Sequence, residues 1–119
     1  MLKVIVDRKT WIRGQGGKGT TRLLTNDGLM CCLGFACHQA GYTKDDLRPL
    51  TTPSSLVKTK DLAIKNSIKQ LIDKNSNFDS NICIKLMHEN DRAEIKDSTR
   101  EKNLRKLGKE AEIEFSFKG

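Results

Sequence analysis

The stretch Leu29–Cys37 reads LMCCLGFAC and contains no charged side chain. Such a run predicts a helix that is apolar on nearly every side, which is typical of a helix in the middle of a core. The Asn-Asp pair at 26–27 can cap its start, and Gly41 fits the left-handed position that ends a helix. We therefore expect a central helix over about residues 29–40, in which Gly34 lets another backbone approach closely.

Segments near the two ends of the chain have the patterns of strands. Residues 2–7 (LKVIVD) are rich in β-branched side chains, and apolar and polar side chains alternate over residues 113–117. Residues 23–25 (LLT) predict a third, short strand that is closed by the turn signal Asn-Asp-Gly. We expect a small, mostly antiparallel sheet with the first and last strands as neighbours.

Further segments have helical patterns. Residues 60–74 place their apolar side chains on one face, and residues 98–110 begin with Ser98 and Glu101 in the spacing of a capping box. Residues 82–89 (ICIKLMHE) fit a strand or a helix, and we favour the helix. The sequence thus predicts a single α+β domain spanning 1–119, with a small mostly antiparallel sheet packed against about three helices.

The charge of the chain limits its partners. The 119 residues include 22 Lys and Arg against 15 Asp and Glu, a net charge of +7, and the surplus lies in residues 1–22 and 58–78. Localised positive charge favours anionic partners, although a solvated Lys-rich surface is an equally simple interpretation. No apolar run has the length of a membrane span, and no secretory signal opens the chain. We expect a cytoplasmic protein with no membrane partner.

Four cysteines raise the question of disulfides or metal. Three of them, Cys31, Cys32 and Cys37, lie in the apolar stretch and are expected to be reduced core residues. A zinc site built from these, Cys83 and the two histidines, His38 and His88, stays open, but no Cys-x2-Cys pair supports it. We therefore predict no metal and no cofactor.

A glycine-rich loop follows the first strand. Residues 13–22 read RGQGGKGTTR, which is not a P-loop, because Lys18 lies on the wrong side of Gly19 and no helix follows. Its exposed N–H groups and basic side chains can still bind an anion. The candidate ligand-binding residues are Trp11, Arg13, Gly16, Gly17, Lys18, Thr20, Arg22, Asn90 and Arg92.

Two of these candidates have a structural alternative. Trp11 can stack on a base while Arg13 binds a phosphate, or it can fix the edge of the core beside the first strand. The polar cluster at 89–92 (ENDR) can bind or catalyse, or it can form a helix C-terminus and a turn. No thiol lies in the context of an activated nucleophile, so we predict no catalytic residue and no enzyme.

Basic residues also line the outward side of the helix predicted at 98–110. They are Lys102, Arg105, Lys106 and Lys109. Acidic residues at 101, 110 and 112 dilute them, and mixed charge of this kind is typical of a solvated face.

Several of these motifs together resemble a known group of proteins. Trp11-Ile12-Arg13-Gly14, the block at 27–35 and Asn90-Asp91 look like a group of small uncharacterised phage and bacterial proteins with a W-x-R-G … M-C-C-L-G-F pattern. The resemblance spans roughly residues 3–117. It implies a compact phage-type protein in the host cytoplasm and favours host takeover or counter-defence by binding.

Three functions are compatible with these features. The first is a non-catalytic protein that captures an anionic ligand, such as a nucleotide signal, through the loop at 13–22. The second is sequence-tolerant nucleic-acid binding, and the third is inhibition of an acidic host protein. A homo-oligomer is compatible with each of them.

Overall fold

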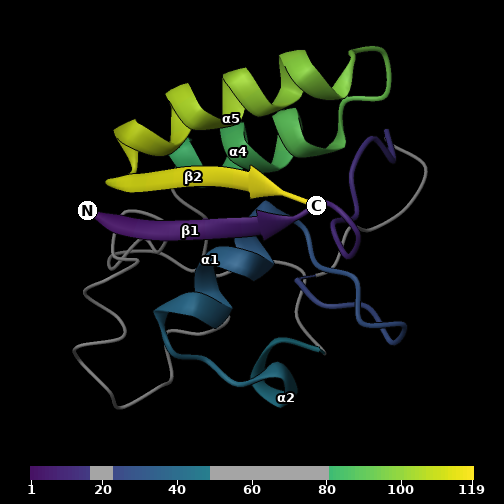
Figure 1. Ribbon diagram of the computed structural model, residues 1–119, viewed down its shortest axis with the longest axis vertical. Coiled ribbons are helices and arrows are strands. Elements are labelled where there is room, and N and C mark those ends of the chain that lie inside the picture. Colours follow the sequence, from purple (N-terminus) through teal and green to yellow (C-terminus); the bar gives the residue numbers. More distant parts are fainter. Residues whose placement is uncertain (17–22, 49–80) are drawn as a thin grey trace.

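The computed structural model describes residues 1–16, 23–48 and 81–119 (Figure 1). Strand β1 (Leu2–Asp7) opens the chain, and helices α1 (Cys32–Ala40) and α2 (Lys44–Leu47) follow. After the second gap come helices α4 (Asn81–Asp91) and α5 (Asp97–Glu110), and strand β2 (Ile113–Lys118) ends the chain. The helix predicted over 60–74 lies outside the described residues.

The sheet consists of β1 and β2, which pair in parallel from Leu2 opposite Ile113 to Asp7 opposite Lys118. The first and last strands are neighbours, as predicted, but the expectation of a mostly antiparallel sheet is wrong. Alternation along a strand reports which side chains face the core and is the same for either direction. The direction of β2 is set by α5, which runs back along the sheet and returns the chain to the end where β1 begins.

The central helix begins later than the sequence predicts. It starts at Cys32, and Cys31 is its N-cap without a side-chain hydrogen bond, so neither Asn26 nor Asp27 caps it. Met30 instead pairs with the segment after β1, as its N–H donates to Thr10 and its carbonyl accepts from Ile12 N–H. The end of the helix at Gly41 agrees with the prediction.

Residues 23–25 form no strand. Leu23 and Leu24 are fully buried in an irregular segment, and the carbonyl of Leu23 lies against Gly34 of α1. A Cβ built at Gly34 would lie 1.9 Å from that oxygen, so the close approach expected at this glycine is confirmed.

Helices α4 and α5 follow the sequence with one exception, whereas the short helix α2 is not predicted by the sequence. Helix α4 confirms the helical interpretation of 82–89. Helix α5 begins at Asp97, but its N-cap is Lys96 and no capping box forms. Glu101, the expected partner of Ser98, instead binds Arg8.

The helices lie on two sides of the strand pair (Figure 1). Helix α5 packs on β2 and α4 packs against α5, whereas α1 packs on β1 and α2 packs against α1. The core between them contains Val4 and Val6 of β1, Ile113 and Phe115 of β2, and the whole segment Cys32–Cys37. No helix among the described residues is long and apolar enough to cross a membrane.

Candidate functional site

Trp11 lies inside the molecule, next to the end of the sheet. It is only 4% exposed, and its indole N–H donates to Asn90 Oδ1 at 2.8 Å. The ring of Phe117 packs against it with centroids 5.0 Å apart, and the guanidinium of Arg13 lies 4.5 Å from its centroid. Trp11 is therefore not accessible to a base, and the structure corrects that part of the predicted site: this residue belongs to the edge of the core.

Asn90 joins three parts of the fold. Besides Trp11, its Oδ1 accepts from the backbone N–H of Cys32 at 3.1 Å, and its Nδ2 donates to the carbonyl of Ile12 and to Asp91. The side chain is fully buried, so it is not accessible to a ligand. The alternative interpretation, in which 89–92 ends a helix, matches the structure, because α4 ends at Asp91.

The start of the glycine-rich loop lies against the C-terminus of α4. Gly14 N–H donates to the carbonyl of Asn90 at 2.9 Å, and Gly16 N–H donates to the carbonyl of Asp91 at 2.6 Å. These two N–H groups are therefore occupied, and the C-terminus of a helix carries partial negative charge. This part of the loop does not form the anion cradle that the sequence predicts. Gly17, Lys18, Thr20 and Arg22 lie outside the described residues.

The arginines of the predicted site already have carboxylate partners. Arg13 binds Asp97 at 2.9 Å, and Arg92 binds Glu94 at 2.9 Å and Glu89 at 3.3 Å. The hydrogen bond from Arg13 lowers the pKa of Asp97, and the hydrogen bond from Arg92 lowers the pKa of Glu94. Two carboxylates compensate Arg92, whereas Asp97 is shared between Arg13 and Arg100.

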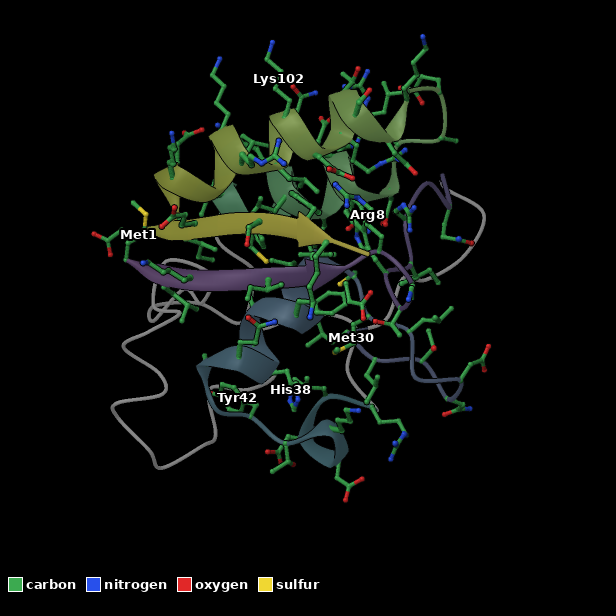
Figure 2. The ribbon with its side chains drawn as sticks, in the orientation of Figure 1. Met1, Arg8, Met30, His38, Tyr42 and Lys102 are labelled. Atoms are coloured by element: carbon green, nitrogen blue, oxygen red, sulfur yellow. The ribbon has the colours of Figure 1, made fainter. Side chains whose placement is uncertain are left out.

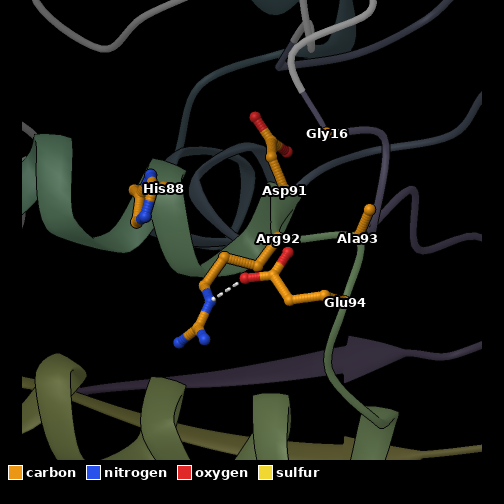
Figure 3. Close-up of a pocket in the computed structure, with 6 residues that line it drawn as sticks. All are labelled: Gly16, His88, Asp91, Arg92, Ala93 and Glu94. Atoms are coloured by element: carbon orange, nitrogen blue, oxygen red, sulfur yellow. Dashed lines mark hydrogen bonds and ion pairs between the residues drawn. The ribbon is translucent and has the colours of Figure 1, made fainter.

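A cavity of about 350 Å³ lies where the loop meets the end of α4 (Figure 3). It brings together Gly16 and Arg92 of the predicted site, and its other lining residues are His88, Asp91, Ala93 and Glu94. The two carboxylates and the helix C-terminus outweigh Arg92, which is bound to Glu94. The electrostatics of this cavity therefore disfavour a phosphate.

The four thiols are packed in the core. All four cysteines are buried. Burial raises the pKa of Cys31 to about 11 and the pKa of Cys32 and Cys37 well above the usual thiol value, so these thiols are poor nucleophiles at neutral pH. Among residues 1–16, 23–48 and 81–119, no group of three or more His, Cys, Asp or Glu side chains is placed to hold a metal ion.

A buried ion pair escaped the sequence analysis. Both side-chain oxygens of Glu101 accept from the guanidinium of Arg8 at 2.8 Å, and only 7% of the Glu101 side chain is exposed. The helical spacing of Glu101 with Leu104 and Gly108 places it on the inward face of α5, so this spacing could have indicated the burial of Glu101 but not its partner.

The inward direction of Glu101 changes the character of the outer face of α5. Lys102, Arg105, Lys106 and Lys109 are exposed, and apart from the adjacent pair Arg105 and Lys106 each lies three or four residues from the next on the helix, so they share that face. We call these four side chains the basic stripe. Figure 2 shows the first of them, Lys102, pointing away from the body of the molecule. Of the three acidic residues expected to dilute the stripe, Glu101 is buried, whereas Glu110 and Glu112 are exposed.

The lysines of the basic stripe are not neutralised by neighbours. None of the three forms an ion pair with another described residue, and Arg105 makes only a long contact of 3.8 Å with Glu101. Two carboxylate oxygens of Glu101 are already held by Arg8 at shorter distances. The stripe thus presents four exposed basic side chains on one face of α5, and none of them has a short ion pair with a described carboxylate.

The Arg8–Glu101 pair predicts a dependence of stability on pH. The hydrogen bond from Arg8 lowers the pKa of Glu101 below 4.5, so the ionised carboxylate stabilises the fold above that pH. The stabilisation is lost as the pH falls through the lowered pKa of the folded state. We expect Glu101→Gln to reduce the free energy of unfolding by about 1–2 kcal/mol at neutral pH, and this difference to shrink towards about pH 3.

Urea denaturation of both proteins across this pH range measures the effect. Glu110→Gln is the control, because Glu110 is exposed on the same helix. A difference for Glu101→Gln that stays constant as the pH falls would show that the charge of Glu101 does not contribute.

No protein-family model, no curated protein and no solved structure matches this chain. The resemblance to small phage and bacterial proteins therefore stays a prediction from the sequence.

Proposed function

We propose that this protein binds nucleic acid without sequence preference, through the basic stripe on α5. The observation that carries this proposal is the exposure of four basic side chains on one helix face while Glu101 of the same helix is buried against Arg8. Uncompensated Lys and Arg side chains gain affinity by releasing counterions from phosphates. This surface needs no cofactor and performs no reaction.

The dimensions of the stripe fit a phosphate backbone. From Lys102 to Lys109 the helix rises by about 10 Å, at about 1.5 Å per residue. Successive phosphates of one strand of a duplex lie about 3.4 Å apart along its axis, so the stripe can meet several of them at once. No pocket is required, and α5 lies at the outer edge of the arrangement of helices and strands in Figure 1.

Capture of a small anion through residues 13–22 stays a prediction from the sequence. In the described part of this loop, the N–H groups of Gly14 and Gly16 donate to carbonyls of α4, and Arg13 binds Asp97. Arg92, which the sequence also predicts to contact the ligand, binds Glu89 and Glu94. A role in counter-defence rests only on the resemblance described above.

The salt dependence of binding tests the proposal. With four phosphate contacts, the logarithm of the affinity for a fluorescein-labelled DNA oligonucleotide should fall with the logarithm of the salt concentration, with a slope of roughly −3 to −4. The double variant Lys102→Ala/Lys106→Ala should bind more weakly at every salt concentration. Its slope should be smaller in magnitude by about two, as expected when two phosphate contacts are lost. Fluorescence anisotropy titrations measure both quantities.

The matched control removes the same charge elsewhere. Lys44→Ala/Arg48→Ala changes α2 and the residue after it, on the opposite side of the molecule from α5 (Figure 1), and should leave the affinity nearly unchanged. Equal weakening in the two double variants would mean that net charge alone drives binding and would contradict a site on α5. No binding at low salt would contradict the proposal altogether and favour the acidic protein partner.

A further inference from the structure

A stack of four side chains ends at the basic stripe. Arg13 lies over Trp11 at 4.5 Å, Trp11 packs on Phe117 with centroids 5.0 Å apart, and the guanidinium of Arg105 lies 5.2 Å from the centroid of Phe117. The order is therefore arginine, indole, phenyl, arginine. The two rings come from the segment after β1 and from β2, so the sheet holds the stack in place.

Arg105 occupies the outer end of this stack. About half of its side chain is exposed (49%), although one face of the guanidinium rests on Phe117. Arg105 therefore presents a flat, charged group to solvent, whereas Lys102, Lys106 and Lys109 present only flexible ammonium groups. A planar guanidinium stacks on aromatic faces, and an ammonium group does not reproduce this geometry.

The aromatic support holds the orientation of this group before a ligand arrives. Phe117 is itself packed between Trp11 and Arg105, and Trp11 is fixed by its hydrogen bond to Asn90. A side chain that is already ordered loses less conformational entropy when it binds. Arg105 is thus placed both to contact a phosphate and to offer a stacking surface.

We infer that Arg105 stacks on an unpaired nucleobase, so that this surface prefers single-stranded nucleic acid to a duplex. The inference rests on the proposed function. Unpaired bases can stack on aromatic rings or on arginine planes beside a basic groove. In a duplex the base faces are covered by neighbouring base pairs, and only their edges are accessible in the grooves. The lysines of the stripe then supply phosphate contacts that either form of nucleic acid can use.

The test combines a conservative protein variant with a ligand that lacks bases. The variant Arg105→Lys keeps the charge and removes the planar group. The probes are a mixed-sequence single strand of about 12 nucleotides, the duplex of the same sequence, and an abasic strand with the same backbone. We expect Arg105→Lys to weaken binding of the normal strand about tenfold, and to change the affinity for the duplex and the abasic strand by less than about twofold.

A matched variant separates stacking from charge. Lys106→Ala removes one ammonium group from the same stripe and should weaken binding of all three probes by a similar factor. An equal loss for all three probes in Arg105→Lys, or no loss, would overturn the stacking role while the proposed function stands. If the wild-type protein bound none of the probes at low salt, the proposed function itself would fail.

Discussion

The Gly34→Ala variant is expected to lose a large part of its free energy of unfolding, because a single methyl group has no place at this position. A Cβ at residue 34 would lie 1.9 Å from the carbonyl oxygen of Leu23 and 3.1 Å from Met30 Cβ. The first contact is with backbone, which cannot rotate away as the end of a flexible side chain can.

Relief of this clash requires α1 to move as a body. Its residues Cys32–Cys37 are all buried, so a movement of more than an ångström opens gaps on the far side of the helix while it relieves contacts on the near side. Overpacking in a core costs about 1–3 kcal/mol and more when backbone is involved, and we expect at least about 4 kcal/mol here. Native proteins are stable by only about 5–15 kcal/mol, so a loss of this size is a large fraction of the total.

Far-ultraviolet circular dichroism with urea titration measures this loss. Gly28→Ala is the matched control: Gly28 has φ +88° and nothing within 4 Å of a Cβ, so its substitution carries backbone strain of about 1 kcal/mol without a clash. Two variants of equal stability would show that α1 does not pack on Leu23 as the structure has it.

The Asn90→Ala variant is expected to show the second largest loss of stability, about 3–5 kcal/mol. The substitution leaves three buried groups without their partner: the indole N–H of Trp11, the backbone N–H of Cys32 and the carbonyl of Ile12. Each unsatisfied buried group costs about 1–3 kcal/mol, and the total is less than the sum because the cavity admits water. The first turn of α1 would lose the side-chain acceptor that binds its N–H.

Trp11 reports on this substitution directly. It is the only tryptophan, so its fluorescence follows both the unfolding transition and the polarity around the indole. Asn103→Ala is the control, since that partly buried amide makes a single hydrogen bond, to Glu89 Oε1 at 2.9 Å. A similar, small loss of stability in both variants would contradict the role of Asn90 in holding Trp11, Cys32 and α4 together.

Asn90→Asp separates the two halves of the amide. The carboxylate can still accept from Trp11 and Cys32, but it cannot donate to Ile12 and it places a charge beside Asp91. We expect this variant to be less stable than wild type at neutral pH and to recover part of the difference as the new carboxyl is protonated at low pH.

The sequence by itself determined those helices and strands whose patterns involve only residues close together in the chain. The β-branched run of β1, the alternation in β2, the apolar character of α1 and its end at Gly41 are local patterns, and the structure has each of them. Even Gly34 was identified in advance, because a glycine inside an otherwise strong helix indicates a close contact.

The candidate site was predicted less well, because its residues were judged by type alone. Arginine, asparagine and glycine in a loop are typical of ligand binding, yet Arg13 is bound to Asp97, and Asn90 and Gly14 hold α4 in place. A carboxylate or carbonyl that neutralises such a group can lie eighty residues away, and no local pattern shows it. The charge of the outer face of α5 was misjudged for the same reason, because Glu101 is buried against the distant Arg8.

Only the tertiary structure decided the direction of the strands and the partner of each buried polar group. The alternation of apolar and polar residues indicates which side of a strand faces the core, and this pattern is the same for parallel and antiparallel pairing. The path of α5 makes the pairing of β1 and β2 parallel. Likewise, the N–H of Cys32 donates to Asn90 because α4 crosses the start of α1. Asn26 and Asp27 lie nearer in the sequence but do not cap this helix. Backbone propensity acts over a few residues, but hydrogen-bond satisfaction and packing are settled among all segments that meet in the core.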